Sequence, residues 1–180
     1  MRPYRRVEDG VGDVEAFPSS CEEAALLGLL RELFVTWWRD IRFGPLIQGA
    51  AYELRLGGPA RLAMLDGYVT IDVGAGHLHL CIGEHRAAPA ELARRRRCAR
   101  AELYRIWLDG APTSWGFRMF NGDDHQQLNV LLPNPFLDAV DRPLPRPDWG
   151  KLACWDALRA RFLGLGQDAG DRLGREFKHG

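Results

Sequence analysis

Residues 51–82 read as four short segments in which apolar and polar residues alternate. Such alternation gives each segment one apolar face, as in a strand with one side buried. Asp66-Gly67 is a strong hairpin signal, because these residue types accept the positive φ of a tight turn. Glycine-rich turns also follow the first and third segments. The stretch therefore predicts a four-stranded antiparallel meander over 51–56, 60–65, 68–73 and 77–82.

Apolar residues spaced three and four apart predict helices before and after this meander. The first helix covers 22–40 and carries acidic residues in its first turn, where the helix dipole favours negative charge. The second begins at Pro89 and covers 89–108, and the third covers 148–163. Between the last two, strands at 114–120 and 126–132 are expected to form a two-stranded hairpin.

These elements predict an α+β fold in the order α-β4-α-β2-α. Its antiparallel sheet would consist of the four-stranded meander plus the two-stranded hairpin, with helices largely on one face. A chain of 180 residues can bury a substantial core, and we expect one domain over residues 19–165. The polar residues 1–18 predict an N-terminal arm, and the glycine-rich residues 166–180 predict a flexible C-terminal tail.

Charge and apolar content limit the partners that we expect. Lys+Arg and Asp+Glu number 24 each, so the chain lacks the positive excess typical of nucleic-acid-binding proteins. No apolar run reaches the roughly 18 residues that span a bilayer, and no apolar segment follows the basic N-terminus as in a secretory signal. We therefore expect a cytoplasmic protein with reduced cysteines and a small-molecule substrate. Membranes and nucleic acid are not expected as partners, and a homodimer stays open.

Three potential metal ligands share one face of the last strand of the predicted meander. In 77–82, alternation points His77, His79 and Cys81 away from the apolar side of the strand. Imidazole suits iron, copper and zinc, whereas thiolate favours zinc or copper(I). A metal site needs at least one more ligand, and His125, which opens a later strand, is the best candidate. The row predicts a metal site with His77, His79 and His125 as ligands and Cys81 as a further candidate ligand. The alternative is that the histidines lie on a solvated face or at a dimer interface.

Neighbouring residues complete the predicted site. Glu84 and His85 directly follow the histidine strand and are candidate catalytic residues. Three apolar residues share one face of the strand at 114–120, and the other face carries Arg118. Either the apolar residues line a pocket beside the metal, or they face the core and Arg118 reaches the site as a third catalytic candidate. The three apolar residues are Trp115, Phe117 and Met119.

Two segments resemble the motifs of cupins, which are metal-binding β-barrels. His77-x-His79 followed by Glu84 resembles the H-x-H-x4-E part of their first motif, and residues 122–129 resemble the G-x2-H-x3-N part of their second. The resemblance implies that His77, His79, Glu84 and His125 are metal ligands. The flanking glycines and the proline of the second motif are absent, and we assign no family on these segments.

The segment HLHLCIGE at 77–84 also resembles the H-Φ-[TS]-Φ strands of the 2H phosphoesterases, with HQQL at His125 in place of their second motif. This resemblance implies a metal-free phosphoesterase. His79 and Gln127 stand where that family has Thr or Ser, so the hydroxyls that hold the phosphate are missing.

The function predicted from these residues is a metal-dependent enzyme that acts on a small organic molecule. Iron or copper oxidoreductase or oxygenase chemistry is favoured over zinc hydrolysis, because a histidine row beside aromatic residues suits a dry oxidation pocket. The ion would keep an open coordination position. Two alternatives stay open. One is a metal-free enzyme, either 2H-phosphoesterase-like or using histidine in acid–base catalysis. The other is a non-enzymatic binding protein with a histidine-lined dimer interface.

Overall fold

A six-stranded antiparallel sheet is the main element of the computed structural model, which describes residues 2–47 and 49–178. Along this sheet the strands follow the order β1 (Tyr4–Glu8), β2 (Gly12–Pro18), β9 (Cys98–Leu108), β10 (Ala111–Asn121), β11 (Gln126–Leu131) and β3 (Arg42–Gly44). A second, three-stranded antiparallel sheet contains β6 (Arg61–Leu65), β7 (Tyr68–Asp72) and β8 (His77–Cys81). A short two-stranded ribbon is formed by β4 (Leu46–Ile47) and β5 (Ala50–Ala51).

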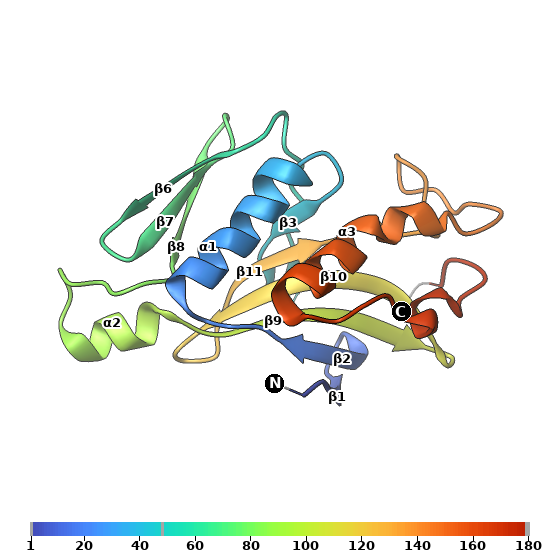
Figure 1. Cartoon of the computed structure of the whole chain (residues 1–180), viewed down its shortest axis with the longest axis horizontal. Helices are drawn as coiled ribbons and strands as arrows, with labels where there is room; N and C mark the ends of the chain where they lie inside the picture. Colours follow the sequence, from blue (N-terminus) through green and yellow to red (C-terminus); the bar gives the residue numbers. More distant parts are fainter. Residues whose placement is uncertain (1, 48, 179–180) are drawn as a thin grey trace.

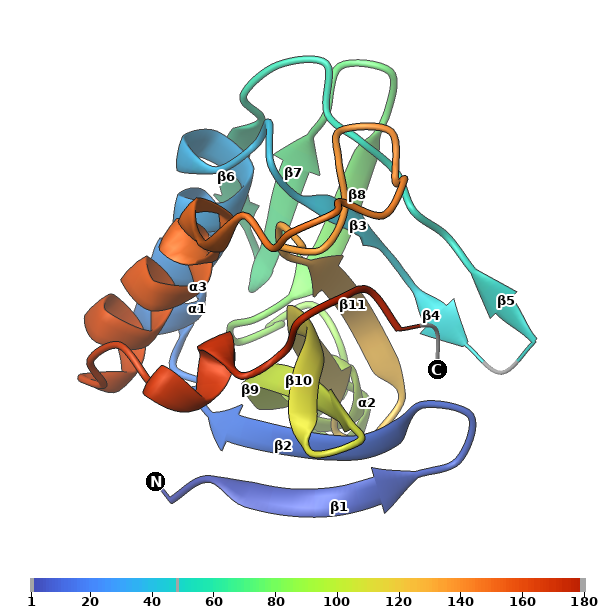
Figure 2. The ribbon, with the colours of Figure 1, turned by 90° about the vertical axis from the view of Figure 1, so that its right-hand side faces the viewer.

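Two helical stretches pack on one side of the large sheet, whereas a further short helix lies at its end beside the turn between β10 and β11 (Figures 1 and 2). The first is α1 (Glu23–Arg31), which continues as the π-helical turn η1 (Glu32–Thr36). Beside it lies a helical stretch made of η2 (Trp149–Leu152), α3 (Ala153–Leu158) and η3 (Arg159–Leu163), and Arg161 of this stretch pairs with Glu32. The remaining short helices are α2 (Ala90–Arg96), at the end of the sheet, and the 3-10 turn η4 (Ala169–Arg172). In the part of the chain that the structure describes, no helix is long and apolar enough to cross a membrane.

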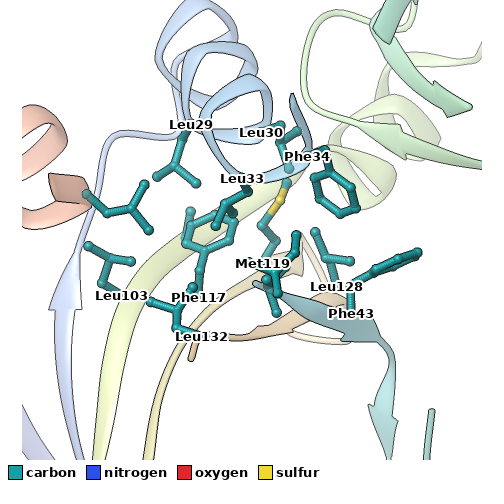
Figure 3. Packing of buried hydrophobic residues seen from close by; sticks show 14 of the residues in the cluster. Leu29, Leu30, Leu33, Phe34, Phe43, Leu103, Phe117, Met119, Leu128 and Leu132 are labelled. Carbon is teal, nitrogen blue, oxygen red and sulfur yellow. The ribbon is translucent and has the colours of Figure 1, made fainter. Parts of the chain in front are cut away.

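The core lies between α1 and the large sheet, as Figure 3 shows. Leu30 of α1 and Leu33 of η1 are fully buried. They belong to the same cluster as Leu103, Phe117 and Met119 of the sheet. Burying a side chain of this size contributes roughly 1.5–3 kcal/mol. The cluster continues into the three-stranded sheet through buried residues of β7 and β8, namely Val69, Ile71 and Leu80. One continuous core therefore joins the two sheets.

The coarse prediction of an α+β fold with mostly antiparallel strands and few helices is confirmed. The finer description differs in the meander, which contains three strands rather than four. Residues 60–65, 68–73 and 77–82 correspond to β6, β7 and β8. The segment 51–56 instead runs toward the large sheet, where Leu54 forms a bridge with Phe43. The alternation in this segment does not correspond to a buried face, because Tyr52 and Leu54 are exposed.

The predicted helix over 89–108 is wrong for most of its length, and with it the predicted order of elements. The helix α2 ends at Arg96, and Cys98–Leu108 is the strand β9, paired with β2 on one side and with β10 on the other. A central strand buried on both faces loses the alternation by which a half-buried strand is recognised. Ion pairs formed across the sheet compensate the buried charges of Glu102 and Arg105. The local sequence pattern does not predict such pairs.

Both ends of the chain are more ordered than the sequence suggests. Residues expected to form an N-terminal arm make β1 and β2, and Val14 and Ala16 are completely buried. In the stretch expected to be a flexible C-terminal tail, residues 169–172 form η4, and Asp171 within it is also completely buried. Residues 179–180 of that stretch lie outside the described residues.

Candidate functional site

His77 and His79 lie side by side on the exposed face of β8, which is an edge strand of the three-stranded sheet. Their ring centroids are 4.7 Å apart, and the rings meet edge to face. Nδ1 of His79 lies 2.9 Å from Oγ1 of Thr70 on the neighbouring strand. The predicted pairing of these two histidines on one face is therefore present, but both are open to solvent.

The other two predicted ligands are not brought to this pair. His125 precedes β11 of the large sheet, where its backbone N–H donates to Oδ1 of Asn121 at 2.9 Å. Cys81 shares the histidine face of β8 but is buried beside Tyr68, its partner on β7, and burial raises the pKa of its thiol. Among the described residues, no three His, Cys, Asp or Glu side chains gather as a metal site requires.

The candidate catalytic residues Glu84 and His85 also lie apart from a common centre. Glu84 is exposed and pairs with Arg86, with 3.1 Å between Oε2 and Nε. His85 packs edge to face against Tyr68, and its Nε2 lies 3.4 Å from Oδ2 of Asp66. That carboxylate also accepts the backbone N–H of Arg86, an arrangement that ties the turn after β8 to the turn between β6 and β7. The contacts of His85 are those of a turn-stabilising residue.

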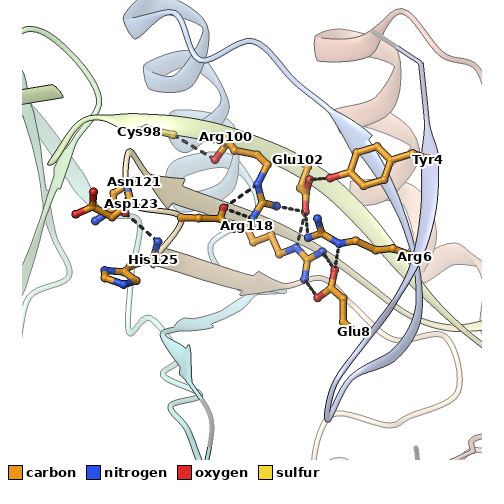
Figure 4. A network of polar contacts seen from close by, with 11 residues as sticks. Tyr4, Arg6, Glu8, Cys98, Arg100, Glu102, Arg118, Asn121, Asp123 and His125 are labelled. Carbon is orange, nitrogen blue, oxygen red and sulfur yellow. Dashed lines mark hydrogen bonds and ion pairs between the residues drawn. The ribbon is translucent and has the colours of Figure 1, made fainter. Parts of the chain in front are cut away.

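Arg118 is held inside a buried network of charges (Figure 4). Its Nη1 and Nη2 donate to the two carboxylate oxygens of Glu8 at 2.7 and 2.6 Å, and its Nε donates to Glu102 at 2.8 Å. Glu102 is completely buried and also accepts from Tyr4 at 2.6 Å and from Arg100 at 2.8 Å. Such bidentate, charge-assisted contacts fix the guanidinium. Arg118 of β10 therefore joins β1 and β9 through Glu8 and Glu102, and it does not reach the histidines.

The apolar residues next to Arg118 face the core rather than a metal pocket. Phe117 and Met119 point toward α1, and Trp115 donates its Nε1–H to Asp171 at 2.9 Å. Because side chains alternate along a strand, Arg118 points to the opposite face of the sheet. Of the two readings left open by the sequence, the core reading of Trp115, Phe117 and Met119 is confirmed by their burial.

A cleft of about 1370 Å³ lies at one end of the large sheet. The turn between β1 and β2, the turn between β9 and β10, and β4 contribute its walls. Apolar side chains form much of the surface, and polar groups are contributed by Thr113, Ser114 and Asn134. The apolar lining residues are Val7, Val11, Leu46, Ile106, Trp107, Leu108, Leu131, Leu132, Leu137 and Phe177.

The charges of the cleft are largely paired within its own lining. The Arg5 guanidinium lies 3.5 Å from the Asp13 carboxylate, Arg42 pairs with Asp141, and Nζ of Lys178 lies 2.8 Å from Asp109. The lining also contains further carboxylates, so acidic groups outnumber the three cations. The additional acidic residues are Glu8, Asp9 and Glu53. The described lining residues include no His, Cys, Met or Tyr. This surface is equipped to hold a largely apolar molecule.

Sequence reasoning missed both the buried charge network and the cleft. The cleft is assembled from turns and strand ends that are distant in the sequence, such as residues 7–13, 106–114 and 131–137. No local signal in the sequence marks the cleft, because the 82% exposure of Val7 in β1 is seen only in the folded structure. No local signal marks the network, because its members look like ordinary surface charges.

One protein-family model matches most of this chain. The family model described as "Family of unknown function (DUF7676)" matches residues 3–164. The chain is a member of the DUF7676 family. No curated protein matches this DUF7676 member.

A solved structure titled "Structure of the Heme Binding Protein ChuX" shares the fold of this DUF7676 chain. The two superpose with a TM-score of 0.50 at 14% sequence identity, over 82% of this chain and 76% of the other. At this identity the likeness concerns the arrangement of helices and strands.

The prediction of a metal-dependent oxidoreductase or oxygenase is wrong. The candidate ligands do not gather into a group of three within the described residues, and the structural neighbour is named as a binding protein. The alternative of a non-enzymatic binding protein is closer to these findings. The histidine-lined dimer interface that accompanied this alternative stays a prediction.

Proposed function

We propose that this chain is a non-enzymatic binding protein that holds a flat, largely apolar ring molecule of the porphyrin class in the cleft beside β9 and β10. The observation that carries the proposal is the cleft itself, with its apolar walls and a volume of about 1370 Å³. Typical small-molecule sites measure roughly 300–1,000 Å³, so this cleft has room for a large ring. The haem-binding protein with the same fold supports the choice of ring.

The residues of the cleft fit the organic ring better than its metal. Haem iron is usually held by His, Cys, Met or Tyr, and the described residues of the lining contain none of these. The cations that would attract the carboxylates of a porphyrin already face Asp13, Asp109 and Asp141. Binding would therefore come from contact between the faces of the ring and the apolar side chains. We expect an iron-free porphyrin to bind about as tightly as haem.

Val7 offers a direct test, because Leu65 is a matched control. Both are exposed apolar residues on strands, at 82% and 77%, but only Val7 lines the cleft. Removing a contact worth about 1.5 kcal/mol weakens binding about tenfold. We therefore expect Val7→Asp to raise the Kd for protoporphyrin IX about tenfold, and Leu65→Asp to leave it unchanged. Titration can be followed by the absorbance of the porphyrin and by quenching of tryptophan fluorescence.

Two results would contradict this proposal. If neither haem nor protoporphyrin IX binds to the wild-type protein, the ring class is wrong. If both bind but Val7→Asp and Leu65→Asp behave alike, the cleft is not the site. A strong preference for haem over the iron-free ring would instead show that a residue of the chain ligates the iron.

A further inference from the structure

The chain after η4 has a fixed base and then crosses one end of the large sheet. Asp171 within η4 is completely buried and accepts hydrogen bonds from three other elements. The backbone at Gly174 packs against the ring of Phe136, so closely that a Cβ atom added there would lie 2.5 Å from Cζ of the ring. Beyond this contact, residues 175–178 run past the turn between β9 and β10, in red in Figure 2.

Residues 175–178 are held loosely. Arg175 and Glu176 are exposed, and a hollow of about 240 Å³ separates this segment from the turn between β9 and β10. An ion pair holds the segment at its end, where Nζ of Lys178 lies 2.8 Å from Oδ2 of Asp109, and both side chains are partly open to solvent. Exposed ion pairs contribute little to stability, and segments with few buried contacts open readily. The segment can therefore leave the sheet without disturbing its base.

The same segment forms part of the wall of the cleft. Phe177 and Lys178 both line the cleft, and Phe177 is partly buried against the hydrophobic cluster of the core. The cleft measures about 1370 Å³ with these residues in place, so the segment borders the cleft and does not fill it. Phe177 is therefore placed to contact a bound molecule, while Lys178 holds the segment at the turn between β9 and β10.

We propose that residues 175–178 are a retaining strap of the cleft, in which Phe177 contacts the bound ring and the ion pair between Lys178 and Asp109 acts as the latch. The inference rests on the proposed binding function of the same cleft. The strap opens to admit the ring and closes beside it, so the ring can leave only after the latch is released. Breaking the latch should therefore speed dissociation. A segment that obstructed the cleft would behave differently, because its release would speed association.

Asp109→Asn tests the latch, and Asp124→Asn is a matched control. Both aspartates occupy turn positions with positive φ, 50° and 61°, which asparagine also accepts. Each is paired with a cation, Lys178 and Arg100 respectively, but Asp124 does not line the cleft. We expect Asp109→Asn to raise the dissociation rate of protoporphyrin IX about two- to fivefold in stopped-flow fluorescence, and Asp124→Asn to leave it unchanged. Lys178→Gln should have the same effect as Asp109→Asn, and the double variant should add nothing further.

Phe177→Ala tests the contact with the ring, and Leu173→Ala is its control. Both are apolar residues of the chain after η4, but Leu173 lines only the hollow beneath the segment and is 57% exposed. Removing an aromatic contact should raise the dissociation rate of protoporphyrin IX about tenfold in Phe177→Ala. Leu173→Ala should leave that rate unchanged.

Limited digestion with trypsin reports on the strap without any ligand. Proteases cut a folded chain where it opens, and Arg175 supplies a cleavage site within the strap. In the ligand-free protein, Asp109→Asn should raise the rate of cleavage after Arg175 about two- to fivefold, whereas Asp124→Asn should not. Bound protoporphyrin IX should slow this cleavage in the wild type.

Three results would overturn the proposal. Equal cleavage after Arg175 in the wild type and Asp109→Asn would show that the ion pair is not a latch. Faster association with unchanged dissociation in Asp109→Asn would show that the segment obstructs the cleft. Equal dissociation rates in the wild type, Phe177→Ala and Leu173→Ala would show that Phe177 does not contact the ring. If the wild type binds no porphyrin but the cleavage pattern is as expected, the ring class and its retention are refuted, whereas the latch is confirmed.

Discussion

Asp171 explains why the C-terminal stretch is part of the fold. Its carboxylate accepts hydrogen bonds from Arg105 at 2.7 Å, Trp115 at 2.9 Å, Trp155 at 2.8 Å and Arg159 at 3.2 Å. These donors come from β9, β10 and the helical stretch 153–163, so one side chain joins three elements. A buried charge is tolerated only when it is paired and hydrogen-bonded, and Asp171 meets both conditions.

Removing this carboxylate should be costly. Breaking a buried ion pair from one side costs roughly 3–5 kcal/mol, because the remaining charges are left uncompensated. We expect Asp171→Ala to lower the free energy of unfolding by about that amount, as measured by urea denaturation. Asp9→Ala changes an exposed carboxylate and should stay within about 0.5 kcal/mol of the wild type. Similar losses in the two variants would show that Asp171 does not anchor the tail.

Tyr104 should make stability depend on alkaline pH. It is buried, it donates to Oδ1 of Asn129 at 2.9 Å, and burial raises its pKa from 10.0 to about 12. The folded state thus holds the phenolic proton more tightly than the unfolded state. Its contribution to stability is complete below pH 10 and disappears as the pH rises to about 12. A shift of this size corresponds to roughly 2–3 kcal/mol.

The measurement compares urea midpoints of wild type and Tyr104→Phe between pH 9 and pH 12. The wild type should lose more stability over this range, because phenylalanine does not ionise and the other titrating groups are common to both proteins. Parallel pH profiles would contradict the role assigned to Tyr104.

At the scale of elements, α1 illustrates how a helix without a side-chain cap is stabilised. The N-cap position Glu22 makes no capping hydrogen bond, so the helix depends on its apolar face. Leu26, Leu29 and Leu30 are buried along this face, whereas Val35, in the π-helical turn that follows, is 42% exposed. Packing against the sheet therefore stabilises this helix more than its local sequence does.

Paired substitutions in this helical stretch separate packing from helix propensity. Leu30→Ala removes a fully buried side chain and should lower the free energy of unfolding by about 2–5 kcal/mol. Val35→Ala, at an exposed position, should change it by no more than about 0.5 kcal/mol. Chemical denaturation followed by circular dichroism measures both. If Val35→Ala costs as much as Leu30→Ala, the helix is not held mainly by its core face.

At the scale of the molecule, ligand binding and stability are linked through the cleft. A ligand that binds only the folded state stabilises it by about 2.7 kcal/mol at a concentration one hundred times its Kd. For a domain of this size, that corresponds to a rise in Tm of roughly 5–10 °C. We expect protoporphyrin IX to produce such a rise with the wild-type protein in scanning fluorimetry. Val7→Asp should show a smaller shift at the same ligand concentration, and an equal shift would place the ligand elsewhere.

The sequence by itself determined those elements whose pattern is local. The alternation and the Asp66-Gly67 turn predicted β6, β7 and β8, and the apolar spacing in 22–40 predicted the helical stretch of α1 and η1. The placement of His77 and His79 on one face also followed from alternation alone. Each of these features depends on residues that are close together in the chain.

Only the tertiary structure decided the identity of β9, the burial of Arg118 and Asp171, and the position of the cleft. The negative charge of Glu102 can be buried in the sheet only because Arg100 and Arg118 compensate it and Tyr4 of the edge strand β1 donates a hydrogen bond to it. The predicted gathering of His125 with the histidines of β8 failed for a related reason: the two regions belong to different sheets. Partners distant in the sequence supply the compensating contacts, and local periodicity carries no information about which distant residues meet.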